Sequence, residues 1–396
     1  MGNQGAWSGA AREWLDWARD YAEAALEACT HCGLCRAGCV SYRALGDPRF
    51  TPESRIEAAA RILREGRLEP GDLEKLYTCT MCGACTVLCP YGIETWRLVH
   101  AARILASRKG LQPESLEEIK RNVTRSGHSF TPDPGQPRRV LEETARAAGV
   151  KPGEPGEALY VPSPFETSLY PNVLRSALAA LRASGVEATV SLRALDLGGN
   201  AAVDAAGLEE GLGLLQRAVE EAEKLGARSI VVSGCGADAK LVAIAEKLGL
   251  DTGRVKVVSI YELLPPAPEE CRSCLLFPSC GYGRFEADKY PAVRSRAGAP
   301  PPRDRPPFTV CCGGGGGLNY LREKPLAQLR DRIVEWRAHH LAAQSNTIIT
   351  PCIKCYTVIR YGLLKARKAR EAKVEHLVVY VSRRLREKQQ STIPKS

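Results

Sequence analysis

The sequence predicts an α-helical N-terminal domain followed by two tandem α/β domains. Three observations support this fold class. One cysteine spacing occurs twice among segments of helical periodicity, strand-like and helix-like segments alternate after residue 157, and sequence blocks repeat at matched intervals. The 396 residues suffice for two or three domains, and 44% hydrophobic residues suffice for their cores. We expect the helical domain at residues 1–130, a linker at 131–157, and α/β domains at 158–268 and 269–396.

Three helices are expected in the N-terminal domain. Apolar residues recur at helical spacing over residues 10–28. A second helix should run from Pro52 to Leu63, because Thr51 can cap its first turn and proline is favoured at the first helical position. A third should run from Glu94 to about Lys109. Helical segments around the cysteine runs favour a helical domain over a compact β-rich one.

The rest of the chain alternates short apolar runs with helical segments. Strands are expected at residues 158–161, 186–192, 229–233, 275–277, 309–310 and 347–350. Helices are expected at residues 171–183 and 208–225. Strands that alternate with helices are typical of a parallel α/β domain. Two segments rich in proline and glycine, at residues 131–137 and 151–156, predict the linker before it.

The two α/β segments align with each other in three blocks. Leu159–Pro164 matches Leu275–Cys280, Asp196–Gly199 matches Cys311–Gly314, and the residues up to Cys235 match those up to Cys352. The first and second blocks are 32 and 31 residues apart, and the second and third are 38 and 40 residues apart. We therefore predict two copies of one fold, called copy one (residues 158–268) and copy two (residues 269–396) below.

Two cysteine runs of identical spacing lie in the N-terminal domain. The spacing is C-x2-C-x2-C-x3-C, and Pro90 follows the second run. The runs are Cys29, Cys32, Cys35 and Cys39, then Cys79, Cys82, Cys85 and Cys89. Bacterial ferredoxins use this spacing for two [4Fe–4S] clusters, and the fourth cysteine of each run ligates the other cluster. We therefore assign one cluster to Cys29, Cys32, Cys35 and Cys89, and the other to Cys79, Cys82, Cys85 and Cys39. Zinc sites favour ligands in two pairs, so zinc or disulfides explain the repeated run less well.

Copy two holds five further cysteines in the pattern C-x30-C-C-x39-C-x2-C. They are Cys280, Cys311, Cys312, Cys352 and Cys355. Glycines from Gly313 to Gly317 let the backbone approach a bulky inorganic core, and their amides can hydrogen-bond to sulfur. We therefore expect Gly313 and Gly314 to contact a cofactor, and the five cysteines to be iron ligands and catalytic residues. Five thiolates exceed the need of one cubane, so a larger, non-cubane cluster or a cubane with a spare reactive thiol would account for them.

With these motifs, the chain resembles the heterodisulfide reductase-related iron–sulfur proteins. These include the heterodisulfide reductase D subunit and the iron–sulfur subunits of glycolate, lactate and anaerobic glycerol-3-phosphate dehydrogenases. The resemblance covers nearly the whole chain and depends most on Cys311-Cys312-Gly313 and Cys352-Ile353-Lys354-Cys355. It implies an α-helical ferredoxin domain with two cubanes, tandem "CCG" domains, and an unusual third [4Fe–4S] cluster at which the reductases cleave a disulfide. Two features depart from the family: copy one lacks most of the cysteines, and Phe277-Pro278-Ser279 lacks the His-Asp that many relatives carry before Cys280.

Three cysteines fall outside these sets. Cys235 is the one cysteine of copy one, which we expect to be a structural half that closes over the third site, so that Cys235→Ser spares the third cluster. Cys271 and Cys274 could bind metal with Cys235, form a redox pair, or be unassigned thiols. Residues 234–239 mimic a dinucleotide-binding fingerprint, but the repeat explains them better as the counterpart of Cys352–Cys355.

Three functions are compatible with these motifs. The favoured one is an iron–sulfur oxidoreductase subunit of the heterodisulfide reductase type, which passes electrons through two cubanes to or from the five-cysteine cluster. The second is the electron-transfer subunit of a flavin-dependent glycolate, lactate or glycerol-3-phosphate dehydrogenase. The third, a non-catalytic binding or assembly protein, is disfavoured by the complete cysteine sets. The expected partner is a flavoprotein or a cytochrome b-type redox subunit.

The net charge of +10 does not indicate nucleic-acid binding. Two four-thiolate cubanes would each contribute about −2 and leave roughly +6, and basic and aromatic residues do not interleave as single-strand binders require. Acidic residues within positions 1–28 argue against a signal peptide, and no apolar run has the length of a membrane span. We expect a cytoplasmic protein that reaches a membrane only through a partner. The basic tail from Lys365 to Lys388 should be a solvated helix, with docking to an acidic partner or membrane surface as the alternative.

Overall fold

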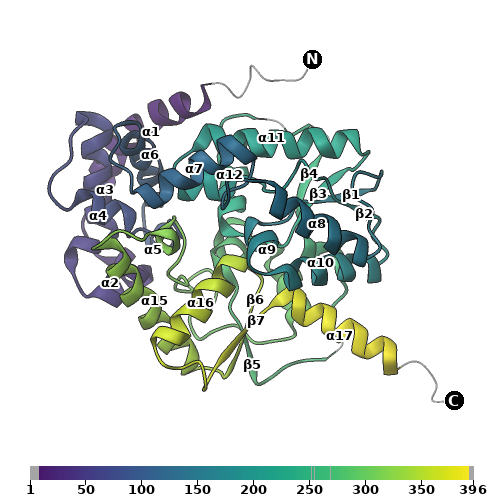
Figure 1. Cartoon of the computed structure of the whole chain (residues 1–396). Coiled ribbons are helices and arrows are strands. Elements are labelled where there is room, and N and C mark those ends of the chain that lie inside the picture. The colour runs from purple at the N-terminus through teal and green to yellow at the C-terminus, as the bar shows by residue number, and fades with distance from the viewer. Residues whose placement is uncertain (1–8, 251, 254, 268, 392–396) are drawn as a thin grey trace.

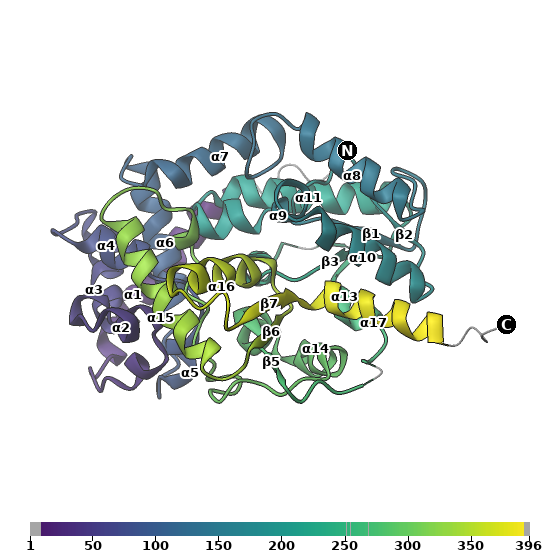
Figure 2. The same ribbon diagram turned by 60° about the horizontal axis from the view of Figure 1, so that its bottom comes forward.

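The computed structural model describes residues 9–250, 252–253, 255–267 and 269–391. The N-terminal helices gather at one end of the molecule, and the two α/β copies lie beside each other at the other end (Figure 1). The second view shows that each copy contains its own small sheet (Figure 2).

The N-terminal region is helical, as expected. Its helices are α1 (Ala10–Ala28), α2 (Val40–Leu45), α3 (Pro52–Ala60), α4 (Asp72–Tyr77), α5 (Ala84–Leu88), α6 (Thr95–Arg108) and α7 (Glu114–Ser126). The Thr51 hydroxyl accepts a hydrogen bond from the Ser54 N–H, so the predicted cap of α3 is confirmed. This helix continues as one wide turn over Arg61–Glu65, which carries it past the predicted end at Leu63. Helices α1, α3 and α6 pack together around Trp14, which is fully buried.

Short helical turns position the cysteine runs between these helices. The first run passes through the turn Leu34–Gly38, and the second ends in α5. These two turns pack against each other. Gly38 lies at this contact, where a Cβ atom would come within 2.8 Å of the Leu88 side chain. The contact therefore brings the ends of the two runs together.

Copy one contains a four-stranded parallel sheet in the order β2-β1-β3-β4. The strands are β1 (Ala158–Tyr160), β2 (Ala188–Thr189), β3 (Ser229–Val232) and β4 (Lys256–Ser259). The helices are α9 (Pro164–Ser168), α10 (Pro171–Ala183), α11 (Leu208–Lys224), α12 (Gly236–Lys247) and α13 (Ile260–Leu263), with a wide turn at Asn200–Asp204. Helix α10 begins and ends at the predicted residues.

Copy two contains a three-stranded parallel sheet in the order β5-β6-β7. The strands are β5 (Cys274–Leu276), β6 (Thr347–Thr350) and β7 (Lys373–His376). The helices are α14 (Tyr290–Ala297), α15 (Leu326–Ala342), α16 (Ile353–Lys365) and α17 (Leu377–Ser391), with a wide turn at Gly281–Phe285. The middle strand of copy two and strand β3 of copy one are each followed by a helix whose N-cap is a cysteine, Cys352 or Cys235. The two sheets thus share parallel strands and this connection, as the repeat predicts.

Several expected elements differ in the structure. The strand expected at residues 186–192 is only the two residues of β2, and Thr309 and Val310 form no strand although both are described. The expected linker at residues 131–157 contains helix α8 (Gly135–Ala147), whose Leu141 and Ala145 are buried. Proline and glycine mark the ends of this helix, and its apolar face packs against α9 and α10.

The C-terminal tail is not the solvated helix that its charge suggested. Residues 373–376 form strand β7, and Leu377, Val378, Tyr380 and Val381 of α17 are buried. Helix α17 packs along α10 of copy one and so ties the two copies together (Figure 2). Within the described part of the chain, we find no helix with the length and apolar character needed to cross a membrane.

Candidate metal centres

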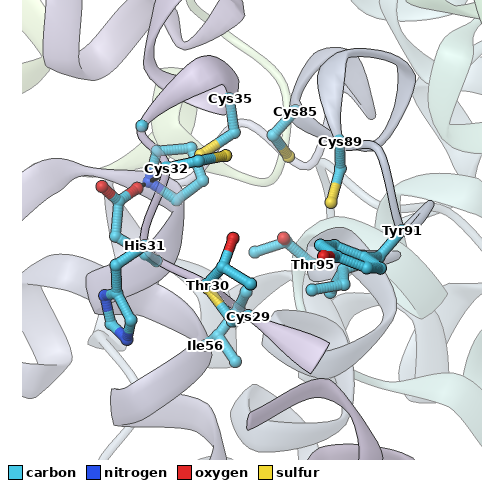
Figure 3. A pocket seen from close by; sticks show the side chains of 14 residues that line it. Cys29, Thr30, His31, Cys32, Cys35, Ile56, Cys85, Cys89, Tyr91 and Thr95 are labelled. Atoms are coloured by element: carbon cyan, nitrogen blue, oxygen red, sulfur yellow. Dashed lines mark hydrogen bonds between the residues drawn. The ribbon is translucent and has the colours of Figure 1, made fainter. Parts of the chain in front are cut away.

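Four cysteines of the N-terminal domain surround a cavity at the surface (Figure 3). They are Cys29, Cys32 and Cys35 of the first run and Cys89 of the second. Ile56 and Ile93 add apolar walls, and Cys32 is exposed. Four thiols around an apolar cavity are a donor set that suits a cubane. The grouping is the crossed one that the spacing predicts, and the role of each cysteine as an iron ligand stays a prediction.

A second cavity has the complementary set of cysteines. It is lined by Cys39 of the first run with Cys79, Cys82 and Cys85 of the second. Cys85 also reaches the first cavity, so the two adjoin. The buried Arg55 donates a hydrogen bond from Nη1 to Cys39 Sγ over 3.2 Å. A guanidinium in this position would stabilise the negative charge of a four-thiolate cluster.

A site for one metal ion is a different arrangement. Among the residues that the structure describes, no three His, Cys, Asp or Glu side chains are grouped so that they could hold a single ion. In a cubane, by contrast, each thiolate binds a different iron atom, so four sulfur atoms stand apart around one core.

The structure brings the five cysteines of copy two together. Cys280 precedes the turn Gly281–Phe285, the adjacent pair ends the loop before the glycines, and the last two lie at the start of α16. Hydrogen bonds link the thiols: Cys311 and Cys355 both donate to Cys312, and Cys355 also donates to Cys352. These donors lower the pKa of Cys312 to about 5, so its sulfur favours the thiolate form at neutral pH.

Backbone amides of the glycine segment also contact the sulfurs. The Gly313 N–H donates to Cys311 Sγ over 3.5 Å, and the Gly314 N–H donates to Cys312. Both glycines therefore lie where a cofactor-binding role requires them, and that role stays a prediction.

The remaining glycines serve a different purpose from the one expected. A Cβ atom on Gly315 would come within 2.6 Å of the Thr80 carbonyl, and one on Gly316 within 2.5 Å of the Cys79 carbonyl. Gly317 similarly faces the Asp204 carbonyl at 2.6 Å. These three glycines allow close contact with the second cysteine run and with copy one, rather than with an inorganic core.

The second cavity and the copy-two cysteines meet directly. The Cys82 thiol donates a hydrogen bond to Cys311. Arg284 fixes this junction, because its Nε donates to the Cys82 carbonyl and its Nη1 to the Thr309 carbonyl, each over 2.7 Å. The buried Arg103 donates to the carbonyls of Gly316 and Cys79.

The three cysteines outside the motifs have distinct positions. Cys235 is buried and hydrogen-bonds to Cys352, so it is part of the third site's cysteine group and not merely of the wall around it. Cys271 and Cys274 are joined by a disulfide. In that pairing they cannot bind a metal together with Cys235.

The sequence analysis missed two buried cations beside these cysteines. Lys354, inside the C-x2-C motif, pairs with Asp204 of copy one, and both side chains are buried. Lys240 of α12 lies 3.9 Å from Cys280 Sγ and donates to the Gly236 carbonyl over 2.5 Å. The place of Lys354 between two cysteines was a usable signal, whereas nothing in the sequence connected Lys240 with Cys280.

Comparison with known proteins agrees with these two cysteine-rich regions. Residues 25–93 match a 4Fe-4S dicluster domain, and residues 274–360 match a cysteine-rich domain. The chain is 33% identical over 92 residues to the glycolate oxidase iron-sulfur subunit of Escherichia coli, which is 23% of each chain. It is 28% identical over 129 residues to the Hdr-like menaquinol oxidoreductase iron-sulfur subunit 2 of Archaeoglobus fulgidus, covering 28% of this chain and 23% of the relative.

A third relative is the D subunit of the dihydromethanophenazine:CoB–CoM heterodisulfide reductase of Methanosarcina barkeri. It is 30% identical over 104 residues, which are 22% of this chain and 25% of the relative. The chain thus spans about a quarter of the length of each of these relatives. The resemblance inferred from the cysteine motifs is confirmed: this is an iron–sulfur protein related to subunits of heterodisulfide reductase and glycolate oxidase.

Proposed function

We propose that the chain is the electron-carrying subunit of an oxidoreductase of the heterodisulfide reductase type. One observation carries this proposal: three sets of cysteines lie in contact, from the surface to the interior. The first cavity is open at Cys32, it adjoins the second through Cys85, and the second touches copy two through Cys82 and Cys311. Electron transfer is fastest between neighbouring centres, so a continuous series supports transport along it.

Each set would hold one iron–sulfur cluster. The crossed sets in the N-terminal domain suit two [4Fe–4S] cubanes, and the copy-two set would hold a third, non-cubane cluster. When bound, such clusters accept and release single electrons. The protein supplies cations around them, namely Arg55 at the second cavity and Lys240 at Cys280. Copy one would then be a degenerate form of the cysteine-rich domain, retained as a wall of the third site.

The reaction best supported at the third site is reduction of a disulfide. Cleavage of a disulfide consumes two electrons and two protons and yields two thiols, so a supply of single electrons must be used twice. The names of the related reductase subunits support this chemistry, and so does a buried site with several sulfur atoms. Partner subunits, a flavoprotein or a cytochrome b-type protein, would exchange electrons at the exposed first cavity. We place this assembly in the cytoplasm.

The test uses the full chain prepared without oxygen. We expect iron for three clusters, and oxidation of a reduced viologen dye when a disulfide is added. Cys312→Ser should abolish the signal of the third cluster in electron paramagnetic resonance (EPR) and the disulfide-dependent oxidation, while both cubane signals remain. The double variant Cys271→Ser/Cys274→Ser is the matched control, because it removes two copy-two cysteines that lie outside the site. Undiminished disulfide reduction by Cys312→Ser would contradict the proposal.

A second candidate function is electron transfer for a flavin-dependent 2-hydroxy acid dehydrogenase. The similarity to the glycolate oxidase iron-sulfur subunit favours it. In that case the third centre passes electrons onward, so a disulfide would leave the reduced chain unchanged. Reoxidation of the clusters by a flavoprotein or quinone analogue, with no response to disulfides, would select this function over the first.

A further inference from the structure

Cys235 of copy one lies inside the group of copy-two cysteines. It is the N-cap of α12, it is 7% exposed, and a glycine stands on each side of it. A Cβ atom on Gly234 would come within 3.0 Å of the Pro351 carbonyl, one residue before Cys352. A Cβ atom on Gly236 would come within 2.6 Å of Cys280 Sγ. The backbone around Cys235 therefore packs directly between two of the predicted iron ligands, at a distance that only glycine permits.

Hydrogen bonds connect the same segment to Cys352. The Cys235 thiol donates to Cys352, and the Gly236 N–H donates to the same sulfur. Cys352 also receives hydrogen bonds from the amide and the thiol of Cys355. Cys352 thus contacts both a ligand of its own copy and a cysteine of the other copy.

Copy one offers Cys235 no thiol partner of its own. The residues that align with the other copy-two cysteines are Pro164, Asp196, Leu197 and Asp238. A solitary buried cysteine usually behaves as a small apolar side chain. Cys235 differs, because its sulfur contacts another sulfur and its neighbour contacts a third.

We propose that Cys235 is the sixth thiol of the third centre and binds iron there, so that the centre is built across the two copies. This inference rests on the proposed function, because it requires a cluster at Cys280 to Cys355. It also deepens it. Four cysteines hold a cubane, and six converging thiols favour the larger, non-cubane alternative.

The first experiment compares Cys235→Ala and Cys235→Ser in the full chain, loaded with iron in the absence of oxygen. Both variants should alter or lose the third-centre signal in EPR and Mössbauer spectra, with less iron per chain. Cysteine-ligated cubane signals from residues 29–89 should persist and show that the fold is intact. The control Cys271→Ala/Cys274→Ala should match the wild type. Wild-type spectra and iron content in both Cys235 variants would overturn the inference.

The proposed function and this inference fail in different ways. If the wild-type chain itself carries iron for the two cubanes alone, the proposed function fails. If the wild type shows a third centre that Cys235→Ala leaves unchanged, only the inference fails.

A second experiment needs no cluster. Diamide, a thiol oxidant, takes up two electrons and two protons when two neighbouring thiols form a disulfide. In the iron-free full chain, brief oxidation should join Cys235 to Cys352, detected by mass spectrometry as a cross-linked peptide pair. Recovery of Cys235 as a free thiol, with Cys352 bonded elsewhere, would contradict the sulfur contact on which the inference depends.

Discussion

Copy one follows strand β3 with Cys235 at the start of α12, and copy two follows β6 with Cys352 at the start of α16. Three residues later, copy one has Asp238 where copy two has Cys355. In the preceding loop, Asp196 aligns with Cys311. Two copies of one backbone therefore carry carboxylates and thiols at corresponding positions.

The carboxylates of copy one are satisfied within the protein. Asp196 accepts hydrogen bonds from the Ser129 hydroxyl and from the Gly198 N–H, the latter over 2.9 Å. Asp238 accepts from the Gly199 N–H over 3.2 Å. Copy two leaves its thiols in contact mainly with one another. The comparison teaches that the α/β backbone provides a cradle for side chains, and that residue chemistry decides whether the cradle is filled by hydrogen bonds or is able to take up iron.

The largest effect is expected from a matched pair at equivalent positions. Cys355→Ser should abolish the third cluster, because Cys355 contacts both Cys312 and Cys352. Asp238→Asn should leave the cluster intact, since burial raises the pKa of Asp238 to about 8 and the amide imitates the protonated acid. Iron content and EPR spectra of both variants measure the difference. Equal loss of the cluster in both would show that the two copies are chemically alike after all.

The next effect concerns the ion pair that crosses between the copies. Lys354→Met leaves Asp204 buried without its cation, which should cost about 3–5 kcal/mol of unfolding free energy. Adding Asp204→Asn should restore a large part of it, because the uncompensated charge is then removed. Chemical denaturation without oxygen measures both. A double variant as unstable as Lys354→Met would mean that packing, and not charge, accounts for the loss.

Glu166 of copy one should make stability depend on pH. Burial raises its pKa from 4.5 to about 7, against hydrogen bonds from Ser233 and Tyr160 that lower it. The folded state therefore binds the proton more tightly than the unfolded state, and stability falls as pH rises from about 4.5 through 7. The loss amounts to at most about 3 kcal/mol.

Glu166→Gln should remove this fall. The comparison is the difference in unfolding free energy between wild type and variant from pH 5 to pH 8. Buried histidines such as His128, whose pKa is lowered to about 4 by burial, act in the opposite direction, but they are common to both proteins. A difference that does not change with pH would refute the assignment to Glu166.

The smallest effect should come from the glycine segment, which only copy two possesses. Gly315→Ala places a Cβ atom 2.6 Å from the Thr80 carbonyl and should destabilise the contact with the N-terminal domain by about 1–3 kcal/mol. Gly213→Ala in α11 is the control, because a Cβ atom there meets nothing within 4 Å. Thermal unfolding midpoints distinguish them. Equal midpoints for the two variants would mean that the glycine contact adds no stability.

The sequence predicted elements and motifs that are local. Helices α1 and α10 have the expected bounds because apolar periodicity and proline positions are read within one segment. The cysteine sets of the N-terminal domain follow from spacing in the same way. Strand β2, with two residues, is too short for its extent to be set by propensity, so its predicted length was wrong.

Features that join distant segments could not be predicted. The contact of Cys235 with Cys352 depends on how the two copies face each other, and neither copy encodes this alone. Pairing of Lys354 with Asp204 spans 150 residues. The basic residues of α17 suggested exposure, but the apolar residues at its start pack against α10, and their burial outweighs the charge of the remaining face.

The contact between Cys82 and Cys311 also sets a timetable for the new polypeptide. Cys89, the last cysteine of the N-terminal domain, precedes Cys355 by 266 residues. A ribosome that adds roughly 5–20 residues per second needs on the order of 10–50 seconds for that stretch. During this interval the first two cysteine sets exist without the third, and Cys82 lacks the thiol that it later contacts. Iron delivery to the third centre must therefore come last.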